Sequence, residues 1–136
     1  MKRLALSTLL GLAMLIGCTP SPPPGKKLSA AEIAEVESDA TSIGHAALVG
    51  DFAIYTASDG KFAIKMVFVE DTGTYRIMDD GHFCLKFDHA FDAGDYCNTI
   101  YRDGQTYHSV GPDDSIVVTY TMMPGNPRNL KIAALP

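Results

Sequence analysis

Two cysteines in neighbouring apolar runs constrain the fold of this chain more than any other feature. The stretch from His82 to Arg102 holds two short runs of aromatic and aliphatic residues, with Cys84 in the first, Cys97 in the second and a polar loop between them. If the runs form a hairpin that folds back midway between the cysteines, Cys84 lies opposite Cys97. Directly opposed Cα atoms are about 4.5 to 5.5 Å apart, within disulfide reach. The pattern predicts a disulfide-linked hairpin, and two unrelated buried thiols are the alternative.

The same register assigns the side chains of the hairpin to two faces. Because side chains alternate along a strand, the large apolar groups of Phe83, Leu85, Phe87, Tyr96 and Ile100 lie on one face. The cystine lies on the other face with His82, Lys86, Thr99 and Tyr101. We therefore expect the first face to contact the core. Closing a loop of this length stabilises a fold by roughly 3 kcal/mol in the chain-entropy account.

The amino-terminal segment has the pattern of an export signal. Lys2 and Arg3 precede a mainly apolar run from Leu4 to Ile16, which is shorter than the ~20 residues of a membrane-spanning helix. Leu15 to Cys18 matches the lipobox of bacterial lipoproteins. An ordinary signal peptide that ends near a cysteine is the alternative.

The lipobox resemblance implies that residues 1–17 are a removable lipoprotein signal peptide. Cys18 then becomes the first residue of the mature chain, with a diacylglyceryl group on its sulfur and a fatty acid such as palmitate on its amino group. The chain has three cysteines, so lipidation of Cys18 leaves an even pair for the disulfide. Two or three acyl chains make a stable membrane anchor.

The proline-rich composition of residues 18–27 predicts a tether between the lipid and the domain. Thr19 to Lys27 reads TPSPPPGKK, which favours an extended polyproline spacer outside any helix or sheet. Thr19 differs from the aspartate that retains similar lipoproteins in the inner membrane. We therefore expect attachment to the periplasmic face of the outer membrane, with the inner membrane and the cell surface as alternatives.

A single helix is expected at the start of the mature domain. Ser29 and Glu32 form a capping box, and Leu28 and Ile33 occupy the positions of a hydrophobic staple. The helix should run for about ten residues and end between residues 38 and 42, where Ser, Asp and Thr weaken it.

The rest of the chain predicts short antiparallel strands. Aspartate and glycine turn signals separate nine runs rich in aromatic and β-branched residues, at 43–49, 52–57, 62–69, 74–78, 82–87, 96–101, 106–110, 115–122 and 130–134. Connections this short favour antiparallel neighbours. Because an open sheet would leave exposed edges, we expect a mainly β fold, either a small antiparallel β-barrel or a strongly curved meander sheet. One N-terminal helix should cover an end of this single domain, residues 28–136.

The charge of the chain limits its partners. Without Lys2 and Arg3, nine of the 11 basic residues remain against 16 acidic ones, a net charge near −7. Nucleic acid is excluded as an expected partner because its phosphates require a basic surface. Anionic lipid gives an acidic chain no added attraction, so the acyl chains must hold the protein on the membrane.

The loop between the two cysteines is the strongest candidate for chemistry. Asp88, His89, Asp92 and Asp95 could supply ligands to a divalent ion, but the spacing of calcium loops is absent. A solvated hairpin loop is the favoured interpretation, so no metal site is predicted. His45, His82, His89 and His108 contain no pair at helical spacing.

No sequence pattern indicates catalysis. The chain lacks a Gly-x-Ser-x-Gly elbow, a Cys-x-x-Cys pair and a phosphate-binding loop. We therefore expect no catalytic residues, no cofactor and no enzymatic activity.

The order of features resembles the exported bacterial family catalogued as domain of unknown function 995. The similarity spans most of the mature domain: Leu28 to Ile33, Ser58 to Gly60, Gly73 to Tyr75, Cys84, Cys97, Tyr101 to Gly104, Gly125 to Pro127 and Leu130. Family members often have tryptophan at the positions of Tyr75 and Phe87, and this chain has none. The resemblance implies an exported β domain with a cystine, and supplies no reaction or ligand.

Three functions are compatible with these features. The leading hypothesis is a non-enzymatic lipoprotein that binds a protein or a cell-envelope component. The second is a carrier of a small apolar ligand in a calycin-like barrel. The third is an inhibitor of a hydrolase that inserts the loop Asp88 to Asp95 into a cleft. The interior distinguishes them, because large side chains filling the barrel would exclude a carrier.

Overall fold

The structure is a computed structural model of the 136-residue chain, and it describes residue 17 and residues 21–132. Residues 1–16 of the predicted signal peptide and the predicted lipidation site, Cys18, lie outside this part. Among the described residues, no helix has both the length and the apolar composition needed to cross a membrane.

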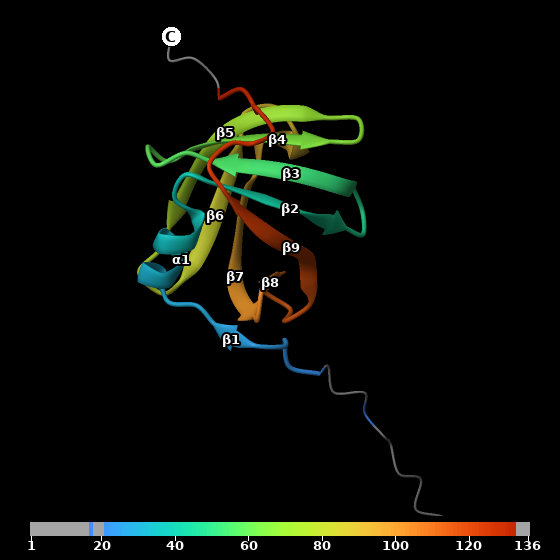
Figure 1. Ribbon diagram of the computed structural model, residues 1–136. Coiled ribbons are helices and arrows are strands. Elements are labelled where there is room, and N and C mark those ends of the chain that lie inside the picture. The colour runs from blue at the N-terminus through green and yellow to red at the C-terminus, as the bar shows by residue number, and fades with distance from the viewer. Residues whose placement is uncertain (1–16, 18–20, 133–136) are drawn as a thin grey trace, which may run out of the picture.

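Eight antiparallel strands close into a β-barrel, as Figure 1 shows. Each strand pairs with the next along the chain, and the last pairs with the first. The strands are β2 (Ala40–Ala46), β3 (Gly50–Thr56), β4 (Lys61–Met66), β5 (Glu70–Ile77), β6 (His82–Phe87), β7 (Asp95–Asp103), β8 (Thr106–Val110) and β9 (Ile116–Pro124). The predicted mainly β fold is confirmed, in its barrel form.

A short ninth strand corrects the predicted tether. Strand β1 (Lys26–Lys27) pairs with Arg102 and Tyr101 of β7, so the last two residues of the predicted spacer lie in the sheet. The two lysines retain the backbone N–H groups that proline lacks, which allows them to join an edge.

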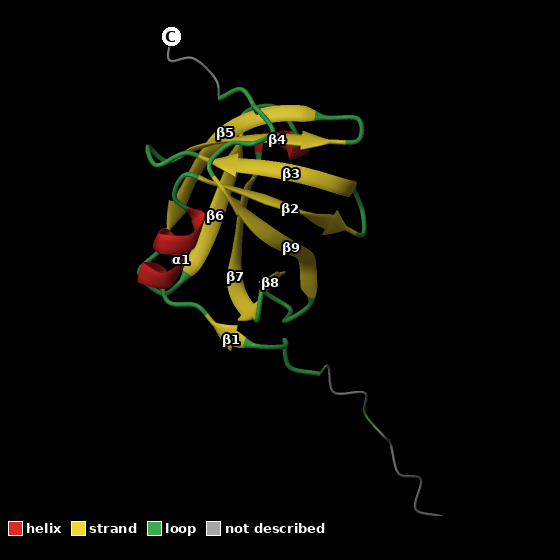
Figure 2. Ribbon diagram, in the orientation of Figure 1, coloured by secondary structure: helices red, strands yellow, loops and turns green. Residues whose placement is uncertain are grey.

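One α-helix covers an end of the barrel. Helix α1 (Ala30–Glu37) starts with the predicted capping box, in which the Ser29 hydroxyl accepts from the Glu32 amide at 3.3 Å and the Glu32 carboxylate accepts from the Ser29 amide at 2.8 Å. Ile33 is fully buried. In Figure 2 the helix lies at one side of the barrel, and the β2–β3 and β4–β5 turns extend on the opposite side. The end under α1 is referred to below as the closed end, and the opposite end as the mouth.

The central hairpin has the predicted register. Cys84 pairs with Cys97, Leu85 with Tyr96 and Phe83 with Asn98, and the two cysteines form a disulfide. Outside the barrel, the Arg76 guanidinium donates two hydrogen bonds to the Asp95 carboxylate, at 2.9 and 2.6 Å. The disulfide and this ion pair thus join β5, β6 and β7 on their outer surface.

Three predicted strands differ from the structure. The predicted strand at 43–49 runs past the end of β2 into the turn at 47–49, and residues 50–51, expected between two strands, begin β3. The turn between β4 and β5 consists of Val67, Phe68 and Val69, whereas the predicted turn at residues 71–73 lies inside β5. The predicted strand at 130–134 is absent over its described residues, 130–132. There the Asn126 side chain bonds both the N–H and the C=O of Leu130, at 2.9 and 2.8 Å, so a side chain takes up the backbone groups that a strand would use.

The disulfide should supply a large part of the stability. Replacing both cysteines with alanine should lower the free energy of unfolding by about 3 kcal/mol, because the unfolded chain loses its covalent loop. Urea unfolding followed by circular dichroism measures this change. A reducing agent should destabilise the wild-type protein to the same extent and leave the double variant unaffected. An unchanged midpoint in the double variant would contradict the prediction.

Candidate ligand-binding cavity

Inward-pointing side chains leave part of the barrel empty. A cavity of about 490 Å³ extends from the closed end to the loops at the mouth. Most of its wall is aliphatic or aromatic, including Ile54, Ile64, Met66, Leu85, Ile100 and Val118. This volume lies within the roughly 300 to 1,000 Å³ that is usual for small-molecule sites.

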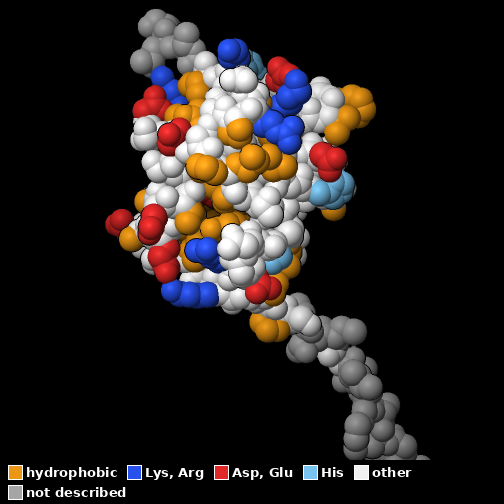
Figure 3. Space-filling view, viewed as in Figure 1, with side chains coloured by type: hydrophobic (Ala, Val, Ile, Leu, Met, Phe, Trp, Pro, Cys, Tyr) orange, Lys and Arg blue, Asp and Glu red, His pale blue; other side chains and the backbone are white. Residues whose placement is uncertain are grey.

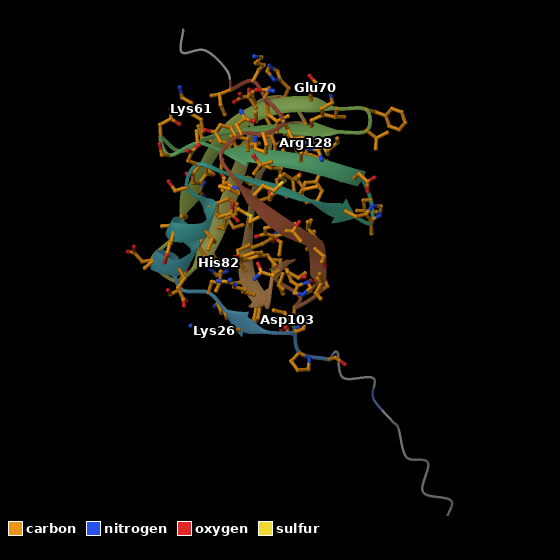
Figure 4. All side chains as sticks on the ribbon, viewed as in Figure 1. Lys26, Lys61, Glu70, His82, Asp103 and Arg128 are labelled. Carbon is orange, nitrogen blue, oxygen red and sulfur yellow. A yellow bond between two sulfur atoms is a disulfide. The ribbon has the colours of Figure 1, made fainter. Side chains whose placement is uncertain are left out.

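Aromatic rings fill the part of the barrel interior that the cavity does not occupy. The rings of Tyr107 and Tyr120 stack with centroids 5.5 Å apart, and the buried ring of Phe62 meets that of Phe87 edge to face at 5.2 Å. Figure 4 shows the side chains on the ribbon, with Lys61 and His82 labelled on the side where α1 lies. These rings confine the empty space to the remainder of the interior.

One glycine makes the arrangement of Tyr120 possible. Gly44 on β2 is paired with Tyr120 on β9, and a Cβ added at Gly44 would lie 2.8 Å from the Tyr120 Cβ and 2.3 Å from the Thr119 carbonyl oxygen. Any larger residue would force β9 away from β2. Glycine therefore sets the position of the tyrosine that reaches the closed end.

The loops at the mouth expose apolar side chains. Leu48 in the β2–β3 turn is 98% exposed and Phe68 in the β4–β5 turn is 95% exposed, while Phe91, Ile116 and Val117 are each more than a third exposed. Figure 3 shows hydrophobic side chains projecting at the edge of the molecule where Figure 1 places the β4–β5 turn. Exposed apolar groups clustered around an opening are typical of a binding surface.

Glu37 is the acidic group of the cavity. It is the last residue of α1, it is only 2% exposed, and it lines the closed end. The Tyr120 hydroxyl donates to its carboxylate at 3.1 Å. Burial raises the pKa of Glu37 to about 7, although the hydrogen bonds from Tyr120 and Thr56 oppose the shift. The carboxyl group therefore changes charge near neutral pH.

Sequence reasoning missed Glu37, although a signal was present. Glu37 follows Ile33 by four residues, so the two share a face of α1. An acidic residue on the apolar face of a capped helix is the pattern that would have identified it. The turns at the mouth gave no such signal, because the apolar residues at 47–49 and 67–69 continue the predicted strands 43–49 and 62–69.

Asp71 on β5 holds the loop that follows β6. Its buried carboxylate accepts from the backbone amides of Ala90 and His89, at 2.7 and 3.0 Å, and contacts the His89 ring nitrogen at 3.0 Å. Burial raises the pKa of Asp71, but the hydrogen bonds from these amides outweigh it and bring the value to about 2. Phe91 of the same loop packs on Phe87, with ring centroids 4.9 Å apart. The loop is thus fixed on the rim.

The loop residues considered as metal ligands have separate partners. Asp88 accepts from the Thr72 hydroxyl, His89 contacts Asp71, and Asp95 binds Arg76. Asp92 is exposed in the short 3-10 turn Phe91–Ala93. The four side chains therefore do not converge, and in the described part of the chain no three His, Cys, Asp or Glu side chains are arranged to hold a metal ion.

The four histidines are also dispersed. His45 contacts Asp51, His82 contacts Asp80, and His108 contacts the Thr119 hydroxyl. Each has a polar neighbour of its own, so the fold does not assemble them into one site.

No family model, no curated protein and no solved structure matches this chain. The resemblance to domain of unknown function 995 and to the lipobox of lipoproteins therefore stays a prediction.

The pH dependence of stability should carry a signature of Glu37. Because its pKa is raised from 4.5 to about 7 on folding, the folded protein binds an extra proton between these pH values. The free energy of unfolding therefore falls as the pH rises through this window. Between pH 4 and pH 8 it should fall by about 3 kcal/mol more in wild type than in Glu37→Gln. Urea unfolding at a series of pH values measures it.

Glu35→Gln is the matched control for this series. Glu35 lies on the same helix, is exposed, and loses the same charge on substitution. Its stability difference from wild type should stay nearly constant across the range. A constant difference for Glu37→Gln as well would contradict the assignment of a buried, titrating carboxyl at residue 37.

Proposed function

We propose that this protein carries a small apolar ligand in its barrel. The observation that supports this function best is the hollow interior, with an apolar wall and an opening between exposed hydrophobic loops. Eight strands enclose either a filled core or space for one small ligand. A filled core would stabilise the fold more, since each void loses dispersion contacts. An empty apolar space that opens to solvent is therefore better explained by an occupant.

The other hypotheses have less support from the fold. Inhibition of a hydrolase needs a protruding loop, whereas residues 88–95 are fixed on the rim through Asp71 and Phe91. Binding of a protein or an envelope component could use the exposed Leu48 and Phe68, but it would leave the cavity behind them unexplained. The carrier hypothesis accounts for both the exposed rim and the empty interior.

We further propose that the carrier is anchored through a lipid on Cys18 at the periplasmic face of the outer membrane. The short apolar leader and the lipobox support the anchor, and the disulfide supports an oxidising compartment. A carrier tethered in this way would meet lipophilic molecules close to the membrane surface, where they partition.

A cavity-filling substitution tests the carrier function. Leu85→Trp places a large ring in the interior and should weaken binding of the neutral fluorescent probe N-phenyl-1-naphthylamine at least about tenfold, because the ring takes up space that the probe needs. Lys86→Trp, on the next residue and the outer face, should leave affinity unchanged. The chain has no natural tryptophan, so each new indole also reports on folding. Equal affinity in both variants, or no binding by wild type, would argue against a carrier.

Substitution of the lipidation site tests the anchor. Cys18→Ser removes the sulfur that would be acylated, so the protein should shift from the membrane fraction to the soluble fraction of cell extracts. Mass spectrometry of the wild-type amino terminus should find Cys18 with the added mass of its acyl chains. A wild-type protein whose first residue lacks fatty acid would contradict this assignment.

A further inference from the structure

The closed end of the cavity presents a buried acid without a basic partner. The Glu37 side chain lines the cavity and is almost fully buried, and its carboxylate accepts from the Tyr120 hydroxyl. None of the ion pairs formed by the described residues includes Glu37. The barrel therefore places one acidic group at the base of an apolar space, and none of the described side chains forms an ion pair with it.

The groups around Glu37 do not balance the charge of its carboxylate. The titratable groups near it are the hydroxyls of Tyr120 and Tyr75, and neither carries positive charge. Of the basic residues on the neighbouring strands, Lys61 pairs with Asp59 at 3.9 Å, and Arg76 and Lys86 are exposed. Glu37 also ends α1, where the helix dipole gives a partial negative charge that favours cations.

A structural role does not explain why this residue is an acid. A glutamine could accept the same hydrogen bond from Tyr120 without the desolvation cost of a buried carboxylate. A buried acid at such a position, facing an empty space, is typical of a site that binds a complementary group.

We propose that the ligand is a cationic amphiphile, with an apolar body along the barrel and an ammonium head that pairs with Glu37 at the closed end. This inference rests on the proposed carrier function and specifies its ligand class. The aliphatic wall formed by Ile54, Ile64 and Leu85 contacts the body, and the Glu37 carboxylate accepts from the N–H groups of the head. An anionic amphiphile would place like charges together, and a neutral alcohol would leave the carboxylate without its counter-charge.

Three probes with one alkyl chain test this ligand class. Dodecylamine, dodecanol and dodecanoate are compared by displacement of N-phenyl-1-naphthylamine at pH 8, below their micelle concentrations, from the full chain with Cys18→Ser. Wild type should bind the amine at least about tenfold more tightly than the alcohol, and the carboxylate most weakly. Glu37→Gln should abolish the preference for the amine over the alcohol, and Glu35→Gln, with the same charge change on the exposed face of α1, should keep it.

A pH series gives a second measurement, which would not change with pH if Glu37 had only a structural role. Dodecylamine stays protonated below pH 9, since alkyl ammonium groups resemble lysine, so only the protein changes charge between pH 6 and pH 8. Protonation of Glu37 should weaken amine binding about tenfold at pH 6 relative to pH 8 and leave alcohol binding unchanged. This series decides the question even if Glu37→Gln fails to fold.

The outcomes separate the ligand class from the carrier function. Equal affinity for amine and alcohol, tighter binding of the carboxylate, or a preference that persists in Glu37→Gln would overturn the cationic ligand and leave the carrier standing. Failure of all three amphiphiles and of the fluorescent probe to bind would overturn the carrier itself, and the cationic ligand with it.

Discussion

The pairing of β2 with β9 is the interaction on which the rest of the structure depends. It joins the first and last barrel strands over seven consecutive residue pairs, from Ala40 with Pro124 to Ala46 with Val118. Closure removes the long unpaired edges that a meander of this size would expose. It also creates an enclosed interior, which must be filled by side chains or left available to a ligand. Side-chain size along the inner faces decides between these outcomes.

The inner faces combine large and small residues so that space remains. Aromatic rings at Phe62, Tyr107 and Tyr120 fill part of the interior, and α1 closes the end beside them. Elsewhere in the wall, small residues face the cavity, including Ser42 on β2 and Ser109 on β8. The Ser109 hydroxyl accepts from Asn98 at 2.9 Å, so these polar groups are satisfied without reaching across the barrel. The same closure that stabilises the sheet thus leaves a cavity with few polar groups.

Local patterns predicted much of this fold, because hairpins and caps are determined by residues close in sequence. The capping box at Ser29, the register of Cys84 with Cys97 and the outer position of the cystine are all confirmed. The closing pair β2–β9 joins strands at opposite ends of the domain, and alternation within either strand does not specify the partner. The turn at Phe68 was misassigned for another reason. Its apolar residues continue the strand pattern of β4, although they lie in a turn at the mouth and not in the core.

The candidate site was beyond sequence prediction because its parts come together only on closure. Glu37 lies at the end of α1 and Tyr120 on the last strand, 83 positions apart, and neither belongs to a motif. Their hydrogen bond connects the helix that covers the closed end to the strand that closes the barrel. An apolar pair at these positions would fill the closed end at lower cost, because burial of the Glu37 carboxyl group lowers the free energy of unfolding once the pH exceeds 4.5, its pKa in the unfolded chain. The presence of a group that weakens the fold, at the base of the barrel cavity, is therefore the strongest physical argument that the cavity is built for a ligand.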